Sequence, residues 1–173
     1  MSYRNLFLTW VVVSMSSCVL YSTQLETMQD FFQDADSEFL ENKWLLSYKD
    51  QEVHVYAVDL SNGTLFSNKS GDQVFFDGWV VTQIKGLGDV SVNIKHEDLS
   101  GGRTFFSNDR YMSLHVCEGW LVKKANEVTS FFQKCEGDTD YLNTISLNKD
   151  GRILSVKQVV DAESNYLNLT KAD

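Results

Sequence analysis

The sequence predicts a mainly β protein, an antiparallel meander that forms a sandwich or a partly open barrel, with one N-terminal amphipathic helix packed on it. Two observations support this prediction. From Trp44 onward, short segments rich in β-branched and aromatic residues alternate apolar with polar side chains. Turn signals separate these segments at intervals of about 8 to 12 residues, a spacing typical of antiparallel sheets.

The helix is expected over about residues 23–41. Apolar residues recur there at steps of three and four, as in one buried stripe, at Leu25, Met28, Phe32, Ala35 and Phe39. Thr23 and Glu26 fit a capping box at the start. The opposite face is acidic and is expected to face solvent, because DADSE lacks the glycine and the ligand spacing of a calcium loop.

The expected strands follow one another to the end of the chain. They are WLLSY, EVHVYAVDL, GTLFS, QVFFD, WVVTQI, VSVNI, RTFFS, YMSLHV, GWLVK, TSFFQ, YLNTISL, ILSVKQVV and YLNL. The turn signals between them are Asn62-Gly63, Ser70-Gly71-Asp72, Asp77-Gly78, Gly101-Gly102, Asn108-Asp109 and Asp150-Gly151.

The N-terminus has the proportions of a secretory signal. Arg4 precedes an apolar run from Leu6 to about Met15. A helix of that length spans ~15 Å, about half of a bilayer's hydrocarbon core, so it is too short to cross a membrane. Small residues then precede Cys18, in an arrangement that resembles a bacterial lipobox with Met15 in place of the usual leucine.

The domain organisation follows from this signal. Residues 1–17 are expected to be a lipoprotein signal peptide, residues 18–22 a lipid-anchored tether beginning at Cys18, and residues 23–173 a single domain. Two other interpretations stay open. One is an ordinary cleaved secretory signal, and the other is a half-buried N-terminal strand with an incidental cysteine.

Composition and charge exclude several classes of protein. Hydrophobic residues make up 43% of the chain and aromatic residues 13%, enough to bury a core, which excludes a disordered chain. The net charge is −9, so electrostatic binding of nucleic acid is not expected.

The remaining cysteines, Cys117 and Cys135, are a plausible disulfide pair in an oxidising compartment. Closing a loop of that size stabilises a fold by roughly 3 kcal/mol in the chain-entropy model. The alternative is two unpaired buried thiols. There is no CxxC motif or Cys/His group, so no metal site and no cofactor are expected.

The chain carries no recognisable catalytic motif, and we do not expect an enzyme. The histidines His54, His96 and His115 are scattered, and His54 and His115 are expected on solvated strand faces because their neighbours are apolar. GxSxG, P-loop and HExxH patterns are all missing from the sequence.

Aromatic residues are the main candidates for a binding surface. Adjacent strand residues point to opposite faces, so in Phe75-Phe76 and Phe105-Phe106 one ring of each pair lies outside the main core unless a helix or second sheet covers that face. The functional alternative is a surface that stacks on sugar rings or accepts an acyl chain. The candidate ligand-binding residues are Trp79, Phe76, Phe106 and Trp120.

Two segments resemble the YjbF/GfcB-type lipoproteins of capsule and exopolysaccharide gene clusters. The segment NGTLFSNKSGDQVFFDGWVVTQIKGLGD is similar to the family's central segment, with Trp79 where the family pattern has arginine. The segment YLNTISLNKDGRILSVKQVV is similar to its closing hairpin. The matching positions are Gly78, Val80 or Val81, Thr82, Gly86 and Leu87 in the first segment, and Tyr141, Gly151, Ser155 and Gln158 in the second.

The resemblance implies an outer-membrane lipoprotein that faces the periplasm and is held by an acylated (palmitate-bearing) Cys18. It implies a non-enzymatic accessory or binding module in the assembly or export of surface polysaccharide, with polysaccharide or export-machinery proteins as partners. Ser155 and Gln158 become candidate ligand-binding groups, unless they satisfy backbone groups at a sheet edge. The alternative functions are a half-barrel carrier of an acyl chain or lipoprotein, and a secreted domain of unknown enzyme activity.

Overall fold

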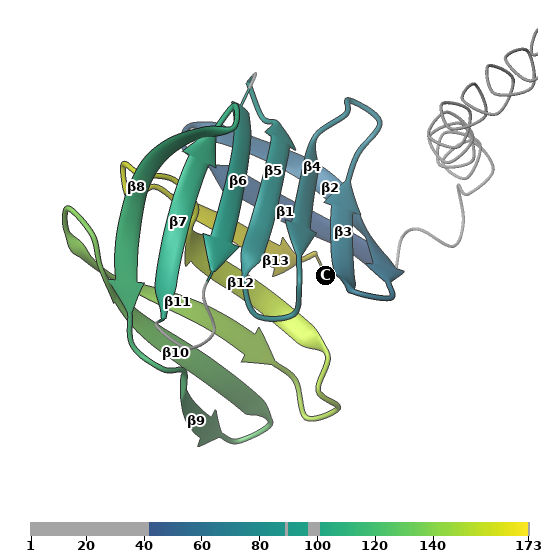
Figure 1. The fold of residues 1–173 in the computed structure, drawn as a ribbon. Coiled ribbons are helices and arrows are strands. Elements are labelled where there is room, and N and C mark those ends of the chain that lie inside the picture. Colours follow the sequence, from purple (N-terminus) through teal and green to yellow (C-terminus); the bar gives the residue numbers. More distant parts are fainter. Residues whose placement is uncertain (1–41, 89, 97–100, 173) are drawn as a thin grey trace, which may run out of the picture. The chain divides into compact units, whose positions relative to one another are not determined.

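The computed structural model describes residues 42–88, 90–96 and 101–172 (Figure 1). The signal peptide predicted at 1–17, the tether at 18–22 with Cys18, and the helix predicted over 23–41 lie outside the described residues. The described part consists of antiparallel strands joined by short turns.

Thirteen strands follow one another along the chain. They are β1 (Lys43–Tyr48), β2 (Gln51–Leu60), β3 (Gly63–Ser67), β4 (Gln73–Phe76), β5 (Val81–Gly86), β6 (Val90–His96), β7 (Gly102–Ser107), β8 (Arg110–Cys117), β9 (Leu121–Ala125), β10 (Val128–Glu136), β11 (Asp140–Leu147), β12 (Ile153–Val159) and β13 (Tyr166–Lys171).

Twelve of these strands form a closed antiparallel barrel, and β9 is the thirteenth strand, attached to β10. Strand β10 makes the closure, because it pairs along its length with β11 and at its C-terminal end with β8. The prediction of a sandwich or a partly open barrel is therefore wrong. The alternation of apolar and polar residues shows which face of a strand is buried. Closure depends instead on which strands pair when they are distant in the sequence, and alternation does not encode this pairing.

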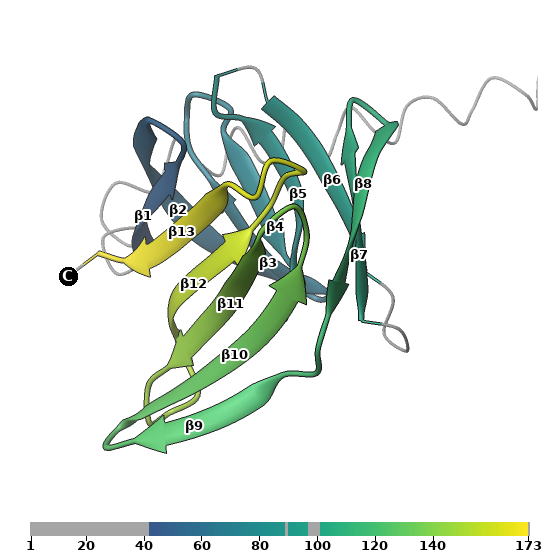
Figure 2. The same cartoon turned by 90° about the vertical axis from the view of Figure 1, so that its left-hand side faces the viewer.

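The barrel closes at a short seam. Only Cys117 with Cys135 and Val116 with Glu136 are in register between β8 and β10. The two cysteines form a disulfide across this seam, which confirms the predicted pair. The N-terminal half of β10 continues beyond the seam as a hairpin with β9, the lowest part of the barrel in Figure 2.

The interior is filled by side chains rather than hollow. Figure 1 shows β3 to β8 as one wall, with β11 to β13 crossing behind it. Inward residues from strands around the barrel, including Leu46, Phe66, Val74, Ile84 and Leu169, are completely buried. Alternation holds at the two phenylalanine pairs, where Phe76 and Phe105 enter the core while Phe75 and Phe106 are half-buried.

Successive turns of an antiparallel meander alternate between the two ends of the barrel. We call one end the cleft rim, formed by the β1–β2, β5–β6, β7–β8 and β12–β13 turns. The other end is the aromatic rim, and it carries the β4–β5 and β8–β9 loops. The two rims differ in the side chains they present.

Candidate functional site

Trp79 projects from the β4–β5 loop at the aromatic rim, and its side chain is 46% exposed. The Asp77 carboxylate fixes this loop, because its Oδ1 accepts hydrogen bonds from the backbone N–H groups of Trp79 (2.8 Å) and Val80 (2.7 Å). Its Oδ2 lies 3.0 Å from Nε2 of His96. The loop therefore holds a partly exposed indole in a defined position.

Two further rings contact Trp79 and complete an aromatic cluster of Trp79, Trp120 and Phe131. The Trp120 ring, in the β8–β9 loop, is centred 5.6 Å from that of Trp79. The Phe131 ring lies edge-on at 5.2 Å and comes from β10. These separations are typical of favourable aromatic pairs. The cluster thus joins the β4–β5 loop to a loop and a strand that lie far from it in the sequence.

Beneath the cluster, buried polar side chains bind both loops from the barrel interior. The Nε2 of Gln158 donates to the backbone oxygen of Trp79 (2.7 Å), and its Oε1 accepts from the Val81 N–H (3.1 Å). The Nε2 of Gln133 donates to the backbone oxygen of Glu118 (3.1 Å) in the other loop. Gln158 therefore anchors the β4–β5 loop, and Gln133 anchors the β8–β9 loop.

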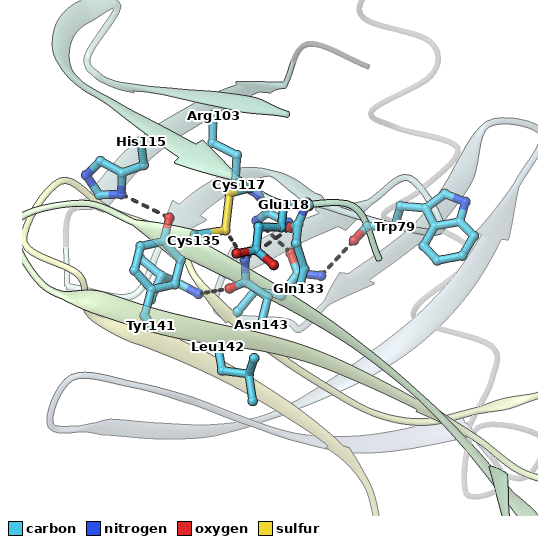
Figure 3. The surroundings of a disulfide bond; sticks show 12 residues. Trp79, Arg103, His115, Cys117, Glu118, Gln133, Cys135, Tyr141, Leu142 and Asn143 are labelled. Atoms are coloured by element: carbon cyan, nitrogen blue, oxygen red, sulfur yellow. Dashed lines mark hydrogen bonds between the residues drawn. A yellow bond between two sulfur atoms is a disulfide. The ribbon is translucent and has the colours of Figure 1, made fainter. Parts of the chain in front are cut away.

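Arg103 links the two glutamines. Its Nη1 donates to Oε1 of Gln158 (3.2 Å), and its Nη2 donates to Oε1 of Gln133 (2.6 Å). Asn143 extends this polar network to the disulfide, since its Nδ2 lies 3.3 Å from Sγ of Cys135 (Figure 3). A continuous set of hydrogen bonds therefore runs from the seam disulfide to the loop that carries Trp79.

The guanidinium of Arg103 is an unusual buried charge. Arg103 is 1% exposed, its Nε has no hydrogen-bond partner, and no carboxylate in the described part of the chain forms a salt bridge with it. Burial lowers the pKa of Arg103 to about 10, against smaller opposing effects of Tyr141 and Asp77. The group remains cationic at neutral pH, so a positive charge lies under the aromatic cluster.

His115 lies beside this network and not in solvent, so the expectation of a solvated His115 is wrong. It is 2% exposed and is paired in register with Arg103. Its Nδ1 lies 3.0 Å from the Tyr141 hydroxyl, and its Nε2 lies 3.2 Å from Oγ of Ser113. Burial lowers the pKa of His115, and burial also raises the pKa of Tyr141 to about 12.

The residues proposed from the sequence fall in three places. Trp79 and Trp120 meet in the aromatic cluster, and Gln158 supports it from below. Phe76 is completely buried in the core, so it offers no ring face to a ligand. Ser155 is half-buried on β12, and Phe106 contacts Tyr111 and the Lys95 ammonium away from the cluster.

Sequence reasoning missed Arg103, Gln133, Asn143 and Phe131. A signal was present, because Arg103 is in phase with Phe105 on its strand and Gln133 is in phase with Cys135. A charged or amide side chain in phase with core residues indicates a buried polar network. Phe131 gave no such signal, because its partner Trp79 is distant in sequence.

Within the described ranges, no three His, Cys, Asp or Glu side chains are grouped so that they could hold a metal ion. No helix in the same ranges has the length and apolar character needed to cross a membrane.

Comparison with known proteins gives a likeness of fold. No family model matches the chain, and no curated protein does. Among solved structures, the crystal structure of the hypothetical lipoprotein YmcC from Escherichia coli K12 matches with a TM-score of 0.53 and 9% sequence identity. The match covers 84% of this chain and 92% of the YmcC chain. The chain thus shares its fold with that protein over most of both lengths.

Proposed function

We propose that this chain is a lipoprotein of the bacterial cell envelope, anchored at Cys18 to the outer membrane and facing the periplasm. Its barrel is a non-enzymatic module that binds carbohydrate during the assembly or export of surface polysaccharide. The lipobox-like SMSSC stretch, the family resemblance and the fold shared with YmcC support this proposal.

The aromatic cluster is the observation on which the binding role rests. A sugar ring has apolar C–H faces, and a partly exposed indole held in a fixed position offers a flat surface for stacking. Trp79 fulfils this requirement because Asp77 fixes its backbone and Trp120 and Phe131 support its ring. The surrounding backbone is preorganised by Gln133 and Gln158, so little ordering accompanies binding.

The acyl-chain carrier has less support. A carrier needs a large dry pocket lined by aromatic rings, whereas the described cleft is about 210 Å³ and has Lys49, Asp161 and Glu163 in its lining. The inward positions of both barrel walls are occupied by packed side chains.

Titration with oligosaccharides cut from the surface polysaccharide of the producing strain tests the binding role. Isothermal titration calorimetry measures the interaction, because the test variant lacks Trp79, the exposed indole on which a fluorescence titration would depend. Trp79→Ala is expected to weaken binding by about tenfold or more, which corresponds to about 1.4 kcal/mol. The matched control is Tyr111→Ala, since Tyr111 is an exposed aromatic residue outside the cluster, on β8. Equal binding by both variants would contradict the proposed site.

Metabolic labelling with a palmitate analogue tests the anchor separately. Label in the outer-membrane fraction that disappears in Cys18→Ala is the expected result. Soluble, unlabelled protein that begins at or after Ser16 would instead support an ordinary secreted domain, without affecting the carbohydrate-binding test.

A further inference from the structure

Strand β8 is paired on both sides only near its C-terminal end. Val116 and Cys117 pair with β10, whereas residues 110, 111 and 113–115 pair with β7 alone among the described strands, and Met112 is the extra residue of a β-bulge between them. The other backbone edge of this stretch therefore has no strand partner in the described ranges. An unpaired edge offers a row of N–H and C=O groups to a further strand.

A cleft of about 210 Å³ adjoins this free edge at the cleft rim. Its apolar lining includes Val92, Phe105 and Met112, and Met112 also belongs to the stretch of β8 with a free edge. Met112 is 49% exposed, so the cleft and the edge form one accessible surface.

The charges beside the cleft favour a basic partner. Asp161 and Glu163, from the β12–β13 turn, line it together with Lys49. The Lys49 ammonium lies 3.6 Å from Asp161 and 3.3 Å from Glu163, so one cation stands against two carboxylates. The Glu163 side chain is 75% exposed, and the whole chain carries a net charge of −9.

We propose that residues 110–115 of β8 and the adjoining cleft receive an extended segment of another protein, in which apolar side chains alternate with basic ones. Backbone pairing with β8 supplies affinity, one apolar side chain enters the cleft beside Met112, and a flanking lysine or arginine faces Glu163. This is strand addition with a side-chain pocket, a common mode of peptide recognition.

One other occupant and one other edge fit less well. A second copy of the chain would bring together two chains that each carry a net charge of −9. Strand β9 is another exposed edge, with every residue accessible, but the described cleft does not reach it. Among the described strands, only β8 has a free edge that adjoins the described cleft.

The test uses the chain from Val19 onward and a fluorescent, end-blocked heptapeptide, Lys-Val-Lys-Leu-Lys-Val-Lys. A matched peptide has glutamate in place of each lysine. Anisotropy is expected to show binding of the lysine peptide at least about tenfold tighter than binding of the glutamate peptide. Hydrogen exchange is expected to slow at residues 110–115. Equal binding of the two peptides, or protection at β9 in place of β8, would overturn the proposal.

Two variants sharpen the result. Glu163→Lys is expected to abolish the peptide preference, whereas Glu127→Lys, an equally exposed glutamate between β9 and β10, makes the same charge change away from the cleft and is expected to leave it intact. Met112→Trp fills the cleft and is expected to weaken lysine-peptide binding. Sedimentation velocity completes the test, because a dimer that Met112→Trp dissociates would assign the surface to a second copy and overturn the proposal.

Discussion

Each rim of the barrel contains a buried charged side chain, and the two side chains differ in how fully their charges are hydrogen-bonded. At the cleft rim, the Asp161 carboxylate accepts hydrogen bonds from the Tyr48 hydroxyl (2.6 Å), the Glu163 and Asn165 backbone N–H groups and the Asn165 side chain. At the aromatic rim, the acceptors for Arg103 among the described residues are only the amide oxygens of Gln133 and Gln158, and its Nε has none there.

This difference indicates that Asp161 stabilises the fold, whereas Arg103 positions the loops of the candidate site. Asp161 has enough donors to offset its desolvation, and these donors fix the β12–β13 turn beside the cleft. Arg103 has neutral acceptors and no counter-charge in the described part of the chain, so its burial is poorly compensated. Arg103 instead holds Gln133 and Gln158, which bind the loops that carry Trp120 and Trp79. Asp161 therefore contributes mainly to stability, whereas Arg103 contributes mainly to the geometry of the aromatic cluster.

The largest predicted effect is that of Asp161→Ala. It leaves the buried Tyr48 hydroxyl and two backbone N–H groups without an acceptor, so the free energy of unfolding should fall by about 4 kcal/mol. Urea unfolding followed by tryptophan fluorescence measures this change. Glu163→Ala, in the same turn but exposed, is the control and should cost less than about 0.5 kcal/mol. Similar small losses in both variants would remove the structural role assigned to Asp161.

The disulfide gives the next largest effect. Replacing Cys117 and Cys135 together by alanine should lower the free energy of unfolding by about 3 kcal/mol, because the bond closes a loop across 18 residues. Amide exchange should also accelerate at the seam, where only two residue pairs join β8 to β10. A reducing agent should destabilise the wild type and leave the double variant unchanged. A double variant as stable as the wild type would show that the seam holds without the bond.

Much of the strand layout could be predicted from the sequence because it depends on local patterns. Each of the thirteen strands overlaps a segment read from period-two alternation, and Asn62-Gly63 and Asn108-Asp109 lie at turns. Closure could not be predicted, because it depends on the pairing of Cys135 with Cys117 and on a change of partner along β10 from β9 to β8.

The candidate site was predicted only in part, for the same reason. An exposed Trp79 is a property of its own loop, but its contact with Phe131 is set by the β9–β10 hairpin. The expected outward position of His115 was wrong because both faces of β8 carry apolar residues, so alternation did not show which face is buried.

A smaller effect on stability is expected from Arg103→Met. Each acceptor keeps another donor, since Oε1 of Gln158 still accepts from the Val81 N–H and Oε1 of Gln133 still accepts from Asn143. The buried charge is removed at the same time, so the free energy of unfolding should change by less than about 1 kcal/mol. Hydrogen exchange should nevertheless accelerate in the loops that carry Trp79 and Trp120. A large loss of stability would contradict this prediction and show that Arg103, like Asp161, stabilises the fold.

The smallest effect is a pH dependence from His115. Burial lowers the pKa of this residue in the folded state, with Arg103 acting in the same direction and Asp138 and Asp161 opposing it. The unfolded chain, whose histidine titrates near pH 6.5, therefore binds more protons than the folded chain as the pH falls. This contribution to stability is present above about pH 7, declines through 6.5, and stops changing below the folded pKa.

Comparison of the wild type with His115→Gln isolates this contribution from that of the carboxylates. The difference between their free energies of unfolding should shrink between pH 8 and pH 5.5. Tyr48→Phe serves as a control at the cleft rim, because its hydroxyl does not titrate in that range and its cost should be the same at both pH values. If the free-energy difference between the wild type and His115→Gln is also the same at both pH values, the imidazole is as well solvated in the folded chain as in the unfolded chain. A declining difference would show that the polar network beside the seam excludes water, the property that also makes Arg103 costly to bury.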